Sequence, residues 1–218
     1  MTSGSEYLLK IRQKLSEIYD YTIGRFISGL FRSPASVLFL GIDNAGKTTL
    51  VNKLKNNANN VFMPTKHSTR DVVEIGNLKA EVVDIGGHRA ARIAWKDYFF
   101  NVDGVVFIVD VCDQERFDEV REAWHAVREL DESIPIVVLM NKIDMLDEKS
   151  QTIRANRPLC VDLERATGMS GSAGMPNIEI VYLSIVEEST YNKDSELCKA
   201  FAWLSGKIDE NFKKNSSK

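Results

Sequence analysis

Along most of the chain, short apolar runs alternate with segments in which apolar positions recur at helical spacing. The apolar runs are rich in β-branched residues, which is typical of buried strands, and the periodic segments predict amphipathic helices. Two alternating runs on either side of Gly76-Asn77 predict a β-hairpin. The expected strands are 36–41, 71–76, 78–84, 104–109, 134–140 and 178–183, and the expected helices are 49–56, 115–130, 147–166 and 194–212.

Strands that alternate with helices predict an α/β fold: a mainly parallel, six-stranded sheet with helices on both faces, which binds ligands at the carboxyl ends of its strands. Pro158 is expected to interrupt the helical segment at 147–166, because proline lacks an N–H group. Residues 167–177 are rich in glycine, serine and methionine and predict an inserted loop. The residues expected to face the core are Val120, Trp124, Val127 and Leu130 in one helix and Leu197, Phe201, Leu204 and Ile208 in the last.

A separate amphipathic stretch, residues 6–31, precedes the first strand. Five basic and three acidic residues lie within residues 1–32, and Gly24 and Gly29 weaken helix formation late in the run. One hypothesis is an interfacial helix that lies on a membrane, and the other is a helix that packs on the domain or on a partner. We divide the chain accordingly into an N-terminal amphipathic helix, residues 1–32, and a globular domain, residues 33–218.

The composition is that of a globular protein, with 218 residues, 44% of them hydrophobic, and a net charge of −3. This charge provides no basic field, so a nucleic-acid partner is not expected. Three widely spaced cysteines without a C-x-x-C pair argue against a disulfide framework and a zinc site, and favour a reducing, cytoplasmic compartment. No apolar run reaches the length of a membrane span. Thr2 argues against N-myristoylation and no prenylation cysteine is seen, so membrane attachment would come from side chains.

The first candidate site is Gly41-Ile42-Asp43-Asn44-Ala45-Gly46-Lys47-Thr48, which matches the phosphate-loop pattern G-x-x-x-x-G-K-[ST] between a predicted strand and a predicted helix. Its glycines let the backbone curl, so that successive N–H groups from Asp43 to Thr49 can face phosphate oxygens. Lys47 brings a positive charge to the outer phosphates, and Thr48 offers a hydroxyl group to Mg²⁺. The helix that starts at Thr49 adds its positive N-terminal end. The pattern predicts a nucleotide site.

Asn141-Lys142-Ile143-Asp144 follows a predicted buried strand and indicates which base is bound. The Asp144 carboxylate can accept hydrogen bonds from both the N1–H and the 2-amino group of guanine, a pairing that adenine does not offer. Asn141 can tie this loop to the phosphate loop, and the stem of Lys142 can cover the purine face. Ser184-Ile185 lies where a second base-contacting loop belongs and would act mainly through backbone N–H groups. We therefore expect GTP and GDP as ligands.

Asp84-Ile85-Gly86-Gly87-His88 follows the end of a predicted strand and supplies the third element. Asp84 can hold Mg²⁺ directly or through a water, a backbone N–H at Gly87 can approach the terminal phosphate, and the His88 ring can orient an attacking water. Thr65 and Thr69 are both candidates for a second Mg²⁺ hydroxyl ligand. These residues predict hydrolysis of GTP, with His88 and Lys47 as catalytic residues.

With these motifs the chain, from about Ser36 onward, resembles small GTPases of the Arf group and, within it, the secretion-associated (Sar-type) GTPases that start COPII coat assembly. The His88 position is specific, because Arf and Ras relatives usually have glutamine there. The resemblance implies a P-loop small GTPase fold for residues 33–218 and favours Thr65 over Thr69. Further matching segments are Pro64-Thr65-x-His67, Trp95-Lys96-Asp97-Tyr98-Phe99 and Ala166-Thr167-Gly168, where that group has an insertion.

The resemblance also implies a cycle. A GDP form would be soluble, and a GTP form would insert the N-terminal helix into the cytosolic face of the endoplasmic reticulum membrane, where Golgi-directed vesicles form. A membrane-bound exchange factor would load GTP, and inner COPII coat subunits would act as effector and GTPase-activating protein. Arg89 and, within residues 66–71, Lys66, Ser68, Arg70 and Asp71 depart from the family pattern on the surface that meets regulators. We interpret Arg89 and Arg92 as partner-facing, since no residue is placed as an internal arginine finger.

Three alternatives are weighed against this interpretation: a GTP-dependent interaction module with little hydrolysis, another Arf-like trafficking GTPase, and a P-loop kinase. His88 and the intact Asp84-x-Gly-Gly sequence argue against the first. The guanine motif at 141–144 argues against the last.

Overall fold

The computed structural model describes residues 35–57, 70–75, 78–84, 92, 95–99, 102–146 and 156–216. These residues all belong to one unit of the chain, Pro34–Lys218. The N-terminal helix expected within residues 1–32 and the loop expected at 61–69 lie outside the described residues.

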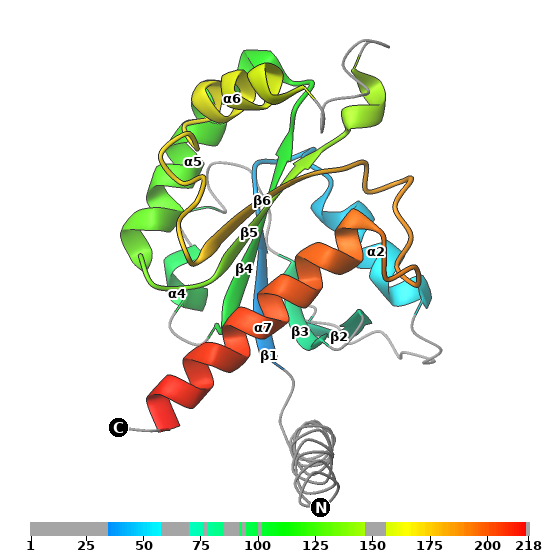
Figure 1. Cartoon of the computed structure of the whole chain (residues 1–218), viewed down its shortest axis with the longest axis vertical. Helices are drawn as coiled ribbons and strands as arrows, with labels where there is room; N and C mark the ends of the chain where they lie inside the picture. The colour runs from blue at the N-terminus through cyan, green and yellow to red at the C-terminus, as the bar shows by residue number, and fades with distance from the viewer. Residues whose placement is uncertain are drawn as a thin grey trace, which may run out of the picture. The chain divides into compact units, whose positions relative to one another are not determined.

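The strands form one sheet in the order β2-β3-β1-β4-β5-β6 (Figure 1). All neighbouring strands are parallel except β2 and β3, which form the expected antiparallel hairpin. Since β1 lies between β3 and β4, its carboxyl end opens near the middle of the sheet, where parallel sheets of this kind bind ligands. The prediction of a mainly parallel sheet is confirmed. The strand bounds are β1 Ala35–Leu40, β2 Arg70–Ile75, β3 Leu78–Asp84, β4 Gly104–Asp110, β5 Ile136–Asn141 and β6 Ile178–Tyr182.

Helices cover both faces of the sheet, as predicted (Figure 1). Successive strand residues point to opposite faces, so β1 contributes Leu38 and Leu40 to one core and Val37 and Phe39 to the other. The first core contains residues of α4, α5 and α6, and the second contains residues of α2 and α7. The bounds are α2 Lys47–Asn57, α4 Trp95–Phe99, α5 Phe117–Leu130, α6 Arg157–Ala166 and α7 Glu196–Ser216, with the 3-10 turns η1 Gln114–Arg116 and η2 Ile143–Met145.

The predicted apolar stripes are confirmed in α7 and, with one exception, in α5. All four stripe residues of α7 are buried, as are Val120, Trp124 and Val127 of α5. Leu130 was expected to face inward, and this is wrong: it is the last residue of α5 and is 41% exposed. Helix α7 begins two residues later than predicted because the Ser195 hydroxyl accepts from Cys198 N–H at 3.1 Å, which marks Ser195 as the N-cap.

No continuous helix runs through Pro158 across the expected segment 147–166, because Asn156 has a non-helical backbone and α6 starts only at Arg157. Pro158 lies in the first turn of α6, where its missing N–H would have had no intrahelical acceptor. The Asn156 side chain caps the same turn by accepting from Leu159 N–H at 3.4 Å. Residues 147–155, the rest of that expected helix, lie outside the described residues. Residues 167–177, where an inserted loop is expected, contain turns but no helix or strand.

Candidate functional site

The phosphate loop connects β1 to α2 and needs glycine at both glycine positions of its pattern, Gly41 and Gly46. Gly41 has φ +140°, and a Cβ there would lie 2.3 Å from the Ile108 carbonyl oxygen of β4. Gly46 has φ +112°, and its Cβ would lie 2.5 Å from the Asn141 side-chain nitrogen. Both conformations disfavour side chains, and both positions lack room for one. The loop is therefore pressed against two neighbouring segments of the sheet.

Lys47 is buried at the start of α2. Its Nζ donates to the Gly41 and Ile42 carbonyl oxygens at 3.0 and 2.8 Å, so the ammonium group lies over the loop that precedes it. Thr48 and Thr49 follow in the first turn of α2 and are exposed. The first N–H groups of a helix lack intrahelical acceptors and favour anions. This end of α2 therefore has the chemistry that a chain of phosphates requires.

Arg116, which the sequence did not single out, holds the phosphate loop from the side. Its guanidinium donates to the Asp43 carbonyl oxygen at 2.9 Å and to both Asp43 carboxylate oxygens at 3.2 and 3.3 Å. Burial alone would raise the pKa of Asp43, but the charge and hydrogen bonds of Arg116, with help from Lys47, outweigh it and lower the pKa below its ordinary value. The loop therefore carries an ionised carboxylate that Arg116 neutralises.

Asn141, at the end of β5, joins three loops, and the predicted tie to the phosphate loop is confirmed. Its Nδ2 donates to the Ala45 carbonyl oxygen at 2.9 Å. Its Oδ1 accepts from Ile185 N–H, also at 2.9 Å. The next residue, Lys142, has a left-handed backbone, and its Nζ pairs with the buried Asp110 carboxylate at 2.7 Å. The expected cover of a purine by the Lys142 stem stays a prediction.

Asp144, in η2, carries a buried carboxylate oxygen to which no described group donates. A buried acceptor without a donor costs free energy of about 1–3 kcal/mol, so such an atom in a ligand site indicates a ligand that donates to it. The Ser184 hydroxyl, after β6, is likewise buried without a partner among the described residues. Asp144 lies in the loop that follows Asn141, and Ser184 lies in the loop that Asn141 contacts through Ile185 N–H.

The turn after β6 leaves the Val186 amide available. Ile185 N–H already donates to Asn141, while Glu187 N–H donates to the Ser184 carbonyl oxygen at 3.1 Å. Between them lies Val186, whose N–H has no partner among the described residues and which is 64% exposed. Ile185 therefore supports the loop, and Val186 offers the amide. The expected contact of Ser184 and Ile185 with a base stays a prediction.

Other expected site residues are only partly described. Asp84 is the last residue of β3 and pairs in register with Phe39, two positions before Gly41, but only its backbone is described. Thr65, Gly87, His88 and Arg89 lie outside the described residues. The interpretation of Arg92 as partner-facing is wrong, because its side chain is 10% exposed and forms an ion pair with Glu119 of α5.

Two further expectations concern the rest of the molecule. All three cysteines are free thiols. The spacing of the cysteines in the sequence likewise argues against a disulfide framework. Within the described ranges, no helix is both long and apolar enough to cross a bilayer.

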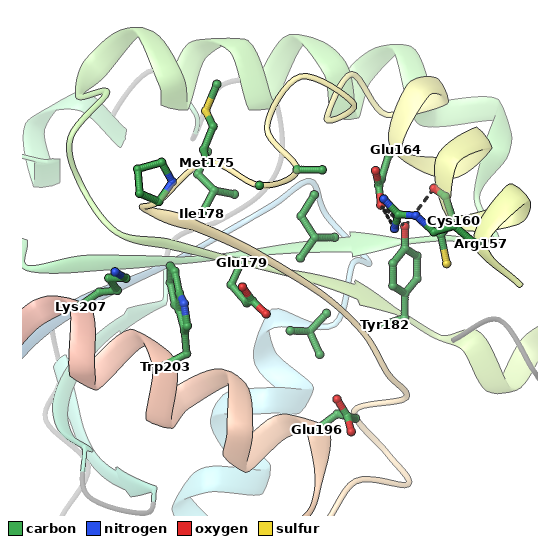
Figure 2. Close-up of a pocket in the computed structure, with 15 residues that line it drawn as sticks. Arg157, Cys160, Glu164, Met175, Ile178, Glu179, Tyr182, Glu196, Trp203 and Lys207 are labelled. Atoms are coloured by element: carbon green, nitrogen blue, oxygen red, sulfur yellow. Dashed lines mark hydrogen bonds and ion pairs between the residues drawn. The ribbon is translucent and has the colours of Figure 1, made fainter. Parts of the chain in front are cut away.

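A groove of about 740 Å³ lies away from these loops, beside β6 and between α6 and α7 (Figure 2). Figure 2 shows Tyr182 and Glu164 side by side within it, with Arg157 and Cys160 next to them. The Tyr182 hydroxyl lies 3.0 Å from the Cys160 carbonyl oxygen and 3.1 Å from the Glu164 carboxylate. None of the residues predicted to bind nucleotide lines this groove. The candidate site is therefore the set of loops at the carboxyl ends of β1, β5 and β6.

The sequence is similar to that of known proteins in one family. Residues 25–208 match the ADP-ribosylation factor family. The Small COPII coat GTPase SAR1 of Encephalitozoon cuniculi (strain GB-M1) is 47% identical over 214 residues, which cover 97% of each chain. An ADP-ribosylation factor of the same organism is 29% identical over 194 residues, which cover 84% of this chain and 89% of that one.

A solved structure gives the same result. The crystal structure of the Small COPII coat GTPase SAR1 from Encephalitozoon cuniculi in complex with GDP has a TM-score of 0.68 at 46% identity, and covers 99% of this chain and 98% of that chain.

Proposed function

The chain belongs to the ADP-ribosylation factor family of small GTPases, and on that basis we propose that it is a GTP-hydrolysing switch that recruits the COPII coat for transport from the endoplasmic reticulum to the Golgi. The proposal that the bound base is guanine rests on the buried Asp144 carboxylate oxygen, to which no described group donates a hydrogen bond. The N1–H and 2-amino groups of guanine are an adjacent pair of donors that one carboxylate can accept. Adenine lacks that pair and would leave the carboxylate unpaired, which penalises the wrong base.

The phosphates would lie at the start of α2. Lys47 already holds its ammonium group over the phosphate loop, and amides from Asp43 to Thr49 would surround the phosphate oxygens. Arg116 fixes the loop through Asp43, and Asn141 fixes it through Ala45. A loop held at both points is preorganised for its ligand, which lowers the cost of ordering it on binding.

Mg²⁺ is part of the proposal. Thr48 would offer a hydroxyl oxygen from α2, Asp84 a carboxylate at the end of β3, and Thr65 a second hydroxyl. These are the hard oxygen donors that Mg²⁺ takes together with nucleotide phosphates. Within the described residues, no group of three or more histidine, cysteine and acidic side chains forms a competing metal site. The ion would neutralise phosphate charge during hydrolysis.

Hydrolysis would depend on His88 and Lys47, with Gly87 donating a backbone N–H to the terminal phosphate. His88 would orient the attacking water, and Lys47 would stabilise charge on the phosphates. Arg92 is tied to Glu119 and Arg116 to Asp43, so neither is placed as an internal arginine finger. We therefore expect slow intrinsic turnover and an acceleration of roughly 10³–10⁵ when a partner supplies an arginine.

The proposed partners follow from the same family. A membrane-bound exchange factor would load GTP, and inner COPII coat subunits would act as effector and activating protein. The amphipathic segment within residues 1–32 would bind the cytosolic face of the endoplasmic reticulum membrane in the GTP form. The protein would return to the cytoplasm after hydrolysis.

Two experiments test this function. In calorimetry, the purified full chain should bind GDP and GTP with Mg²⁺ and should not bind ADP or ATP at comparable concentrations. In liposome flotation with purified inner coat subunits, a non-hydrolysable GTP analogue should bring both chain and coat to the membrane, and GDP should not. A chain without residues 1–32, first shown to bind GDP, should stay in solution. Equal flotation in all nucleotide states would contradict the switch.

A further inference from the structure

Lys53, in the middle of α2, reaches the loop that follows β6. Its Nζ donates to the Ile185 carbonyl oxygen at 2.7 Å and to the Val186 carbonyl oxygen at 2.9 Å. The lysine side chain is half-buried. Hydrogen bonds from an ammonium group are stronger than those between neutral groups. One cation on the phosphate-binding helix therefore bridges two successive carbonyl groups of the loop that bears the available Val186 amide.

The peptide group between Ile185 and Val186 explains why this contact matters. The described chain contains no cis peptide bond, and in a trans peptide the C=O and N–H groups point in opposite directions. A donor that fixes the Ile185 carbonyl therefore also fixes the direction of Val186 N–H. Because hydrogen bonds polarise one another, the cation also strengthens that N–H as a donor.

The turn is held on its other side as well. Ile185 N–H donates to Asn141 at 2.9 Å, and Glu187 and Glu188 N–H both donate to the Ser184 carbonyl oxygen. These contacts occupy the neighbouring amides and leave Val186 N–H facing no described acceptor. Asn141 therefore sets where the loop lies, and Lys53 sets how the Val186 amide is directed.

We infer that Lys53 is a positioning residue for the purine: it orients and polarises the Ile185–Val186 peptide so that Val186 N–H donates to O6 of guanine. The inference rests on the proposed guanine site. If Asp144 accepts from N1–H and the 2-amino group, the next atom on that edge of the base is O6, an acceptor that requires a donor. Lys53 would thus contribute to base recognition without touching the nucleotide.

A purely structural role makes a different prediction. If Lys53 only fastens α2 to the loop, its loss would weaken binding of every nucleotide that fits the site by the same factor. If it positions a donor for O6, its loss should matter less for 6-thio-GDP, whose sulfur is a weak acceptor. Comparing the two nucleotides separates the roles.

The test measures release of bound GDP and of bound 6-thio-GDP into excess unlabelled GTP, with Mg²⁺ present, for the full chain and its variants. Lys53→Met keeps the length of the stem and removes the ammonium group, and should release GDP about tenfold faster, which is the size expected for losing charge-assisted bonds in a half-buried site. The same variant should release 6-thio-GDP only about twofold faster, since that contact is weak already. Lys53→Gln, which is too short to bridge both carbonyls, provides a second loss variant should the first fold poorly.

Two controls complete the design. Lys53→Arg keeps N–H donors at a similar reach and should restore GDP release to within about threefold of the wild type. Lys193→Met removes an exposed lysine from the same connection between β6 and α7 and should not change release. Wild-type release from Lys53→Met and Lys53→Gln, or equal acceleration for both nucleotides, would overturn the inference while leaving the guanine site intact. Failure of the wild type to bind GDP would overturn the proposed function and, with it, this inference.

Discussion

The Arg116 guanidinium holds Asp43 by both its backbone carbonyl oxygen and its carboxylate, across 73 residues of sequence. Arg116 lies just before α5, while Asp43 lies in the phosphate loop. The pair is partly solvent-accessible, with side chains 30% and 56% exposed, so it adds little to global stability. Its effect is local, because the contact with the Asp43 carbonyl fixes one peptide of the loop that would surround the phosphates.

We predict that Arg116→Met raises the pKa of Asp43 toward its ordinary value of 3.8 and accelerates GDP release several-fold, about 3–10-fold by the loss of one local anchor. The pKa falls on folding, so this carboxylate stabilises the folded state above its unfolded pKa and loses that effect as pH falls through the folded pKa. Side-chain carboxyl NMR over an acid titration measures the first effect. Arg165→Met, which removes an exposed ion pair on α6, should alter neither quantity. An unchanged Asp43 titration would contradict the role of Arg116.

Asp144→Asn should exchange guanine specificity for xanthine specificity. The amide of asparagine donates where the carboxylate accepts, and xanthine carries a carbonyl oxygen in place of the 2-amino group of guanine. We expect GDP affinity to fall by at least about 10²-fold, and xanthosine diphosphate to bind more tightly than GDP, since unpaired buried groups enforce the choice. Competition binding with both nucleotides measures the change. Retained preference for GDP would remove Asp144 from base recognition.

The parts of the site that could be predicted from the sequence are those in which neighbouring residues carry the chemistry. The phosphate loop and the guanine motif are contiguous patterns, and the tie from Asn141 to the phosphate loop follows from placing both at the carboxyl ends of parallel strands. Arg116 and Lys53 could not be found this way. Arg116 acts on a loop residue 73 positions away in the sequence, and Lys53 acts on one 132 positions away. Neither belongs to a periodic pattern.

Helix ends are the part of the fold that the sequence predicts least well. Proline disrupts helix interiors, and Pro158 lies in the first turn of α6, after the Asn156 cap, where its missing N–H is harmless. Leu130 continues the apolar spacing of α5 but falls at its end, where the stripe no longer meets the sheet. Periodicity identifies the buried face of a helix more reliably than its last residue.

Gly46→Ala should be strongly destabilising, and Gly206→Ala should be stabilising. At Gly46 a Cβ would require a left-handed backbone and would lie 2.5 Å from the Asn141 amide, so we expect a loss of at least about 2 kcal/mol in the free energy of unfolding. In the interior of α7, Gly206 has open space around its Cα, and alanine should add about 0.5–1 kcal/mol. Urea unfolding of the GDP-bound proteins measures both. Equal stability of the two variants would contradict the close contact of Gly46 with Asn141.

His88→Gly should bind GTP as the wild type does but lose activator-stimulated hydrolysis. If His88 orients the attacking water, its loss should reduce the stimulated single-turnover rate by about 10²–10⁴-fold, the usual contribution of a positioned acid–base group. His125→Ala removes an exposed imidazole from α5 and should hydrolyse GTP at the wild-type rate. An unchanged stimulated rate in His88→Gly would remove this residue from the mechanism.

Tyr182→Phe should reduce stability at neutral pH and flatten the loss of stability at alkaline pH. The hydroxyl group interacts with the Cys160 carbonyl oxygen and with the buried Glu164 carboxylate, so its removal should cost about 1–2 kcal/mol. Burial, and then the nearby Glu164 charge, raise the pKa of Tyr182 above its ordinary value of 10.0. The folded state therefore keeps a proton that the unfolded chain releases, so this stabilisation is complete below pH 10 and declines as pH rises beyond it.

Urea unfolding from pH 8 to about 11 should show a steeper decline in the wild type than in Tyr182→Phe, by up to about 1.4 kcal/mol per pH unit. Tyr191→Phe, at a side chain that is 71% exposed, should keep the wild-type decline, and parallel profiles for wild type and Tyr182→Phe would show that the Tyr182 proton is not retained on folding.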